Sequence, residues 1–159
     1  MSRVVELVLH GLPETQSLLD IGTGSGVFAE AFAKKGLKVS GVDANPQMLP
    51  VAGQFVPAGD FKEAEAENLP YQDAQFDLAF MGLVLHETDD PLAALQEAHR
   101  VTCRRTAVLE WPDEDQPVGP PRGERLPEAK IRALAAEAGF KKVDRYRLET
   151  LILYLLSSV

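Results

Sequence analysis

Three glycines at alternate positions, Gly22, Gly24 and Gly26, constrain the fold of this chain more than any other feature. They follow a compact apolar run, residues 17–21, and precede a helical pattern, residues 27–35, within LLDIGTGSGVFAEAFAKKG. A glycine-rich turn between a strand and a helix presents backbone N–H groups that typically hold an anionic or zwitterionic ligand. The sequence therefore predicts a strand–turn–helix unit with a ligand site at the turn.

Strand-like and helix-like segments alternate along the rest of the 159 residues. Further strands are expected at 38–42, 61–66, 76–81, 106–110, 142–148 and 151–156, and further helices at 2–10, 91–101 and 127–138. A helix capped by Asn45 should last only about two turns, because Pro50 and Gly53 fall where it would continue.

This alternation indicates one doubly wound, Rossmann-like α/β domain over residues 1–159, with a mostly parallel seven-stranded sheet and helices on both faces. The last two strands are joined tightly through Glu149 and Thr150, so a C-terminal hairpin should add one antiparallel strand. The 1–16 segment reads as a short N-terminal helix, and the Pro/Gly-rich 111–126 segment as a long loop. In such sheets the ligand lies at the carboxyl ends of the strands.

Composition and charge narrow the classes of partner. The net charge is −8, and the first 96 residues hold 14 acidic but only 5 basic side chains, which disfavours a nucleic-acid partner. No apolar run reaches the roughly 18 to 20 residues of a membrane span, and the N-terminus does not resemble a secretory signal, so a cytoplasmic location is expected. Cys103 is the single cysteine, so no internal disulfide and no metal site are expected. The sequence is compatible with a homo-oligomer as well as with a monomer.

The spacing of the glycines limits the ligand further. A dinucleotide fingerprint, G-x-G-x-x-G, needs glycine where Val27 stands, and a P-loop needs a lysine that is missing here. Asp43, 23 residues after Asp20, closes the second strand and is placed to accept hydrogen bonds from ribose hydroxyls. The pattern thus favours a ligand with a ribose and without a pyrophosphate, and it argues against a nicotinamide dehydrogenase.

Four segments, LLDIGTGSG, VSGVDANPQML, AEAENLPYQDAQFDLAF and LVLHETDDP, together resemble the class I S-adenosylmethionine-dependent methyltransferases, in particular the small methyltransferase-type domain of quinone-biosynthesis enzymes. The resemblance covers about residues 18–139 and implies S-adenosylmethionine as cofactor. It also implies these roles: Asp20 and the turn Gly22, Thr23, Gly24, Ser25 and Gly26 at the methionine part, Asp43 at the ribose, Ala44 and Met48 beside the adenine, Glu65 and the Ala66 amide at the adenine edge, and the Met81 and Gly82 carbonyls at the ammonium group. Glu65 stands where the family usually has Asp.

The acceptor site is expected above the ends of the fourth and fifth strands, bordered by Leu83, Leu85, His86, Trp111 and the 111–126 loop. His86 is the candidate proton acceptor, because a histidine titrates near neutrality. Positioning is favoured over base catalysis, so Trp111→Ala is expected to lower turnover more than His86→Ala. The structural alternatives are that Asp20 anchors the turn, that Glu65 is a solvated carboxylate, and that His86 and Trp111 are rim or loop residues.

Two functions compete with methyl transfer to a small molecule. One is a non-catalytic module that binds S-adenosylmethionine or S-adenosylhomocysteine, and the other is a methyltransferase whose acceptor is a protein. The short N-terminal region and the irregular middle of the chain motivate the first of these.

Overall fold

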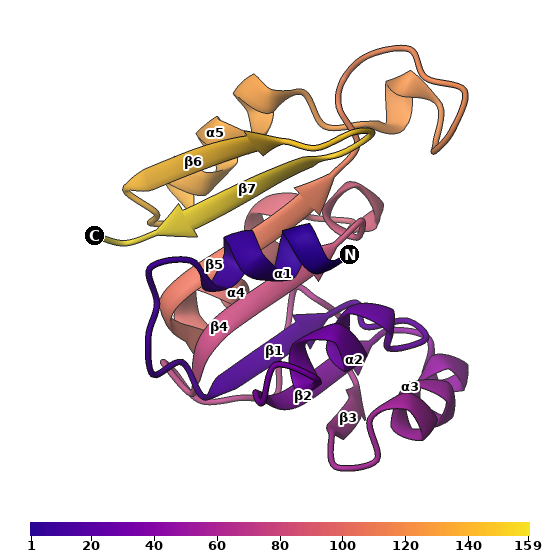
Figure 1. Ribbon diagram of the computed structural model, residues 1–159. Helices are drawn as coiled ribbons and strands as arrows, with labels where there is room; N and C mark the ends of the chain where they lie inside the picture. The colour runs from indigo at the N-terminus through magenta and orange to yellow at the C-terminus, as the bar shows by residue number, and fades with distance from the viewer.

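The computed structural model describes all residues, 1–159, as a seven-stranded sheet with helices on both faces (Figure 1). The strands are β1 (Ser17–Ile21), β2 (Lys38–Asp43), β3 (Asp60–Glu63), β4 (Phe76–Gly82), β5 (Thr102–Glu110), β6 (Lys142–Arg147) and β7 (Ile152–Ser157). The helices are α1 (Ser2–Leu9), α2 (Val27–Ala33), α3 (Leu49–Phe55), α4 (Pro91–Val101) and α5 (Glu128–Glu137), with short 3-10 turns η1 (Pro46–Met48), η2 (Leu85–Glu87) and η3 (Arg122–Glu124). The predicted fold class is confirmed.

The strand order is β3-β2-β1-β4-β5-β7-β6, and β7 runs opposite to the other six strands. The order reverses between β1 and β4, which pair in parallel from Leu18 with Leu78 to Ile21 with Met81. Chain connections leave these two strands toward opposite sides, so a crevice opens at their carboxyl ends. The hairpin of β6 and β7 supplies the single antiparallel strand that the sequence predicts.

The core has two layers, one on each face of the sheet. The layer under α4 and α5 includes Leu19 and Ile21 of β1, and the layer under α1 and α2 includes Leu18 of the same strand. Alternate side chains of β1 thus enter opposite layers, and both layers are apolar because helices cover both faces of a parallel sheet. Figure 1 shows α1 and α2 on the near face, with α4 and α5 behind the sheet. None of the helices is long and apolar enough for a membrane crossing.

The structure differs from the sequence expectations in the segment after β2. Asn45 does cap the next turn, because its side-chain oxygen accepts from the Gln47 amide at 3.1 Å. Pro50, however, lies in the first turn of α3 and does not end a helix. A proline is tolerated there because the first amides of a helix have no intrahelical acceptor.

Two strand boundaries differ from the expected ones by three residues or more. β3 ends at Glu63, and the chain then leaves the sheet after one more backbone hydrogen bond, from the Ala64 amide to the Asp43 carbonyl at 3.1 Å. Residues 64–66, expected to be strand, are therefore free to form a wall beside the end of β2. β5 begins at Thr102, four residues before the expected start, because residues 102–105 already pair with β4, beginning with Thr102 opposite Phe76.

Candidate functional site

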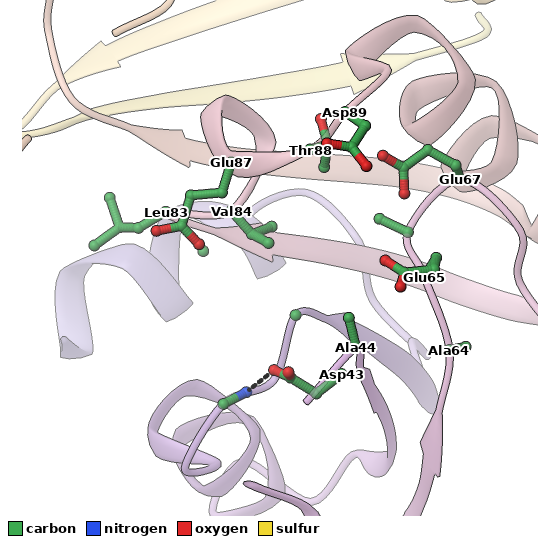
Figure 2. Close-up of a pocket in the computed structure, with 14 residues that line it drawn as sticks. Asp43, Ala44, Ala64, Glu65, Glu67, Leu83, Val84, Glu87, Thr88 and Asp89 are labelled. Atoms are coloured by element: carbon green, nitrogen blue, oxygen red, sulfur yellow. Dashed lines mark hydrogen bonds between the residues drawn. The ribbon is translucent and has the colours of Figure 1, made fainter. Parts of the chain in front are cut away.

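A cavity of about 300 Å³ lies at the carboxyl edge of the sheet, where the strand order reverses. It is lined by Gly22, Gly24, Asp43, Ala44, Ala64, Glu65, Ala66, Glu67, Gly82, Leu83, Val84, Glu87, Thr88 and Asp89. Figure 2 shows that the side chains come from three places: the glycine turn with the end of β2, the wall after β3, and the segment after β4.

The glycine turn requires all three of its glycines. Gly22, Gly24 and Gly26 have φ angles of 72°, 53° and 83°, a region that side-chain-bearing residues seldom adopt. A Cβ on Gly26 would also lie 2.9 Å from Cα of Ala52 in α3. Gly26 thus permits a close approach of α2 and α3.

The Asp43 carboxylate connects the glycine turn to the end of β2. Oδ2 accepts from the Gly24 amide at 2.8 Å, and Oδ1 accepts from the Asn45 amide at 2.9 Å (Figure 2 shows the first bond). A carboxylate oxygen can accept two hydrogen bonds, so each oxygen of Asp43 still has capacity for a donor inside the cavity. The protein itself therefore holds Asp43 in place before any ligand binds.

Asp20 lies beneath the glycine turn and does not line the cavity. Its side chain is almost fully buried and accepts from the Thr23 hydroxyl at 2.9 Å. Burial disfavours the charged form and raises the pKa of Asp20 from 3.8 to about 7. This geometry is the anchoring role considered as the alternative for Asp20, and its contact with a methionine part stays a prediction.

The remaining predicted cofactor residues divide between the cavity and the regions around it. Gly22, Gly24, Ala44, Glu65, Ala66 and Gly82 line the cavity, as Asp43 does, whereas Thr23, Ser25, Gly26, Met48 and Met81 do not. Met81 is fully buried in the core, and Met48 is exposed on the short turn before α3. The backbone roles assigned to the residues outside the lining stay predictions.

The cavity is acidic, a property that the sequence analysis missed. Five of its lining residues carry carboxylates, Asp43, Glu65, Glu67, Glu87 and Asp89, and none is Lys, Arg or His. Carboxylates gathered in one concave surface raise the local concentration of cationic ligands. The signal in the sequence was the pair of acidic clusters around residues 63–67 and 87–90, which alone gave no reason to place them together. No cluster of three or more His, Cys, Asp or Glu side chains is arranged to hold a metal ion.

The residues predicted for the acceptor site lie near the ends of β4 and β5, but their side chains have different surroundings. Leu83 lines the cavity in a left-handed conformation, with φ at 60°, where its amide donates to the Leu109 carbonyl. Leu85 does not line the cavity, because its side chain is fully buried in the core layer under α4. A leucine so placed contributes to packing, and its contact with an acceptor stays a prediction.

His86 is paired with Glu110, a buried residue at the end of β5 that the sequence analysis did not single out. The Glu110 carboxylate is 2.9 Å from His86 Nδ1 and accepts from the His86 amide at 3.0 Å. These hydrogen bonds and the nearby negative charge raise the pKa of His86 against the opposing effect of burial. The two residues are 24 positions apart in the sequence, so no local sequence pattern predicts their pairing.

Trp111 belongs to the 111–126 loop and does not line the cavity. Arg125 organises this loop: its buried guanidinium donates to the carbonyls of Pro112, Glu114, Val118 and Pro120 and lies 5.6 Å from the Trp111 ring centre. A Cβ on Gly119 would lie 2.7 Å from the same ring. Trp111 is therefore packed as a loop anchor, the alternative considered for it.

The fold and the cavity define a Rossmann-like α/β domain with a ligand site at the switch point of its sheet. The methyltransferase domain family matches residues 19–108. The structure is similar to that of an S-adenosylmethionine-dependent methyltransferase from Aquifex aeolicus, with a TM-score of 0.82 and 26% identity over 98% of this chain and 89% of that one. The chain belongs to the class I S-adenosylmethionine-dependent methyltransferase family.

Two curated relatives indicate the range of the family. The demethylmenaquinone methyltransferase of Thermotoga maritima is 35% identical over 112 residues, which are 68% of this chain and 48% of that protein. The malonyl-[acyl-carrier protein] O-methyltransferase of Serratia marcescens is 38% identical over 87 residues, which are 55% of this chain and 34% of that protein. The chain thus spans about half the length of the first relative and matches about a third of the second.

Proposed function

We propose that this chain transfers a methyl group from S-adenosylmethionine to a small-molecule acceptor, by in-line displacement at the sulfonium carbon. The observation that carries the proposal is the Asp43 carboxylate, fixed by the Gly24 amide at the switch-point cavity. Membership of the methyltransferase family and the likeness to the Aquifex aeolicus structure support it.

The residues of the cavity fit this cofactor. Asp43 retains acceptor capacity for two ribose hydroxyls, and Glu65 on the opposite wall offers an acceptor for the adenine amino group. The cofactor carries a sulfonium and an ammonium group, and the cavity wall is acidic with no cationic side chain. Bound there, the cofactor would supply an already activated methyl group, so the protein needs mainly to orient the acceptor and exclude water.

The acceptor is placed on the side of the cavity formed by Leu83, Val84 and Glu87. This segment follows β4, on the far side of the switch point from Asp43. A cofactor whose ribose is held at Asp43 would direct its sulfonium methyl group toward this segment. The two curated relatives are named for small or carrier-linked acceptors, which supports a small molecule here.

Calorimetry and a transfer assay test this proposal together. We expect S-adenosylmethionine and S-adenosylhomocysteine to bind, and NAD not to bind. A labelled methyl group should then pass to the small-molecule fraction of a cell extract. Binding without transfer to any fraction would favour the non-catalytic module, and label in the protein fraction would favour a protein acceptor. Absence of binding would refute the cofactor assignment itself.

A further inference from the structure

The His86–Glu110 pair has features that packing alone does not require. Both oxygens of Glu110 are used: His86 Nδ1 lies 3.1 Å from Oε1 and 2.9 Å from Oε2, the His86 amide donates to Oε1, and the Trp111 amide donates to Oε2. The side chains of Glu110 and His86 are only 1% and 7% exposed. The carboxylate thus holds the ring and the backbone of the same histidine.

The hydrogen bonds determine which nitrogen of the ring carries the proton. An ionised carboxylate can only accept, so Nδ1 must be the donor in the neutral ring, and Nε2 keeps its lone pair. Nε2 makes no hydrogen bond within the chain, and its ion-pair neighbour is Oε1 of Glu87 at 3.9 Å. His86 itself does not line the cavity, and Glu87, which does, is the residue that connects Nε2 with the cavity rim.

The charges that face His86 come from three elements and all have one sign. They are Glu110 at the end of β5, Glu87 on η2 and Glu124 on η3. An imidazolium formed at this position would gain from all three carboxylates, most of all from Glu110 with its direct hydrogen bond. The surroundings therefore favour uptake of a proton by His86.

We propose that Glu110 is a positioning residue that holds His86 with its proton on Nδ1, so that Nε2 accepts the proton that the methyl acceptor loses. The inference rests on the proposed function. As a nucleophilic atom of the acceptor forms its bond to the methyl carbon, the carbon–sulfur bond breaks and its electron pair stays on sulfur. The proton of that nucleophilic atom passes to Nε2, and the resulting imidazolium remains paired with Glu110. Solvent then takes the proton, and no oxidant or further reactant is needed.

Nitrogen-15 NMR of the histidine rings tests the positioning without any methyl acceptor. In the parent protein we expect the neutral His86 ring to carry its proton on Nδ1, and the pKa of His86 to lie above the ordinary value of a histidine. Glu110→Gln should lower the pKa of His86 and give a mixture of the two neutral forms. Glu149→Gln, in the exposed hairpin turn, is the matched control and should change neither property.

Turnover supplies the second measurement, with S-adenosylmethionine as donor and the small-molecule fraction of a cell extract as acceptor. His86→Gln should lower turnover by about 10² to 10⁴, and Glu110→Gln by about tenfold or more, with the Kd for S-adenosylmethionine nearly unchanged. Parent turnover should fall as pH drops through the His86 pKa measured by NMR. Circular dichroism checks that each variant is folded, and His86→Asn serves if His86→Gln is not.

The outcomes separate the two proposals. A parent ring protonated on Nε2, or a His86 titration that Glu110→Gln leaves unchanged, would overturn the positioning role. Full turnover in a folded His86 variant would overturn the proton transfer. Failure of S-adenosylmethionine to bind would instead overturn the proposed function, while the NMR result would still report on the pair.

Discussion

Replacing Asp43 should weaken cofactor binding about a hundredfold while leaving the fold intact. The carboxylate is expected to accept two ribose hydroxyls, and hydrogen bonds to a charged acceptor contribute about 1.5 to 3 kcal/mol each. Water in the emptied site recovers part of this, so Asp43→Ala should lose about 3 kcal/mol, a factor of about 100 in Kd. The same substitution frees the amides of Gly24 and Asn45, both near enough to solvent to be hydrated, so unfolding free energy should change by about 1 kcal/mol or less.

Asp43→Asn sharpens the experiment. The asparagine side chain keeps one oxygen but turns its NH₂ group toward one of the two backbone amides from which Asp43 accepts hydrogen bonds. Asp43→Asn should therefore also bind the cofactor poorly. Calorimetry with S-adenosylmethionine and S-adenosylhomocysteine should show equal losses, because both contain the ribose. Asp60→Asn, an exposed carboxylate at the start of β3, is the control. An Asp43→Ala protein that binds within about threefold of the parent, less than 1 kcal/mol, would refute the ribose assignment.

Three further predictions concern stability. Gly26→Ala should lower the unfolding free energy in urea by about 2 kcal/mol or more, because the new methyl group clashes with Ala52 in addition to the unfavourable φ angle. Gly36→Ala measures the cost of the φ angle alone, because φ is 88° there and nothing lies within 4 Å. Equal losses in the two variants would show that the clash with Ala52 costs nothing. Asp20→Asn should become more stable relative to the parent as pH rises from about 4 to about 8. The pKa of Asp20 in the folded protein is raised to about 7, so the parent loses stability as pH rises through that value. If the difference in unfolding free energy between Asp20→Asn and the parent did not change with pH, the raised pKa of Asp20 would be refuted. Arg125→Met should lower the unfolding free energy by about 2 kcal/mol and speed proteolysis of the loop after β5, without weakening cofactor binding. An unchanged rate of digestion would show that the Arg125 guanidinium does not hold this loop in place.

The surroundings of Trp111 and His86 change one of our expectations about the proposed acceptor side. From the sequence, Trp111 was expected to contribute more to turnover than His86. Trp111 instead packs against Arg125 and Gly119, whereas His86 is held next to a residue of the cavity rim. We therefore now expect the larger loss of turnover from the His86 substitution.

The fold could be predicted because its signals are local. The glycines at positions 22, 24 and 26 need left-handed backbone, the strands are short apolar runs, and Asn45 and Asp90 cap the segments that follow them. Alternation of such segments is compatible with few sheet topologies. In a sheet of this kind a ligand binds where the strand order reverses, which predicts a ligand site beside Gly22 and Asp43. The predicted element boundaries differ from the structure where pairing with β4 extends β5 and where Pro50 lies in the first turn of α3.

The arrangement of side chains on the proposed acceptor side was decided only by tertiary structure. The Glu110–His86 pair spans 24 residues, and the carboxylates that line the cavity come from segments that the sheet order brings together. Leu85 and Leu83 are two residues apart and equally apolar, yet one is core and the other lines the cavity. Sequence periodicity reports which face a residue takes within its own element, because that depends on neighbours along the chain. It carries no information on which element will lie opposite, because that depends on how the whole sheet is assembled.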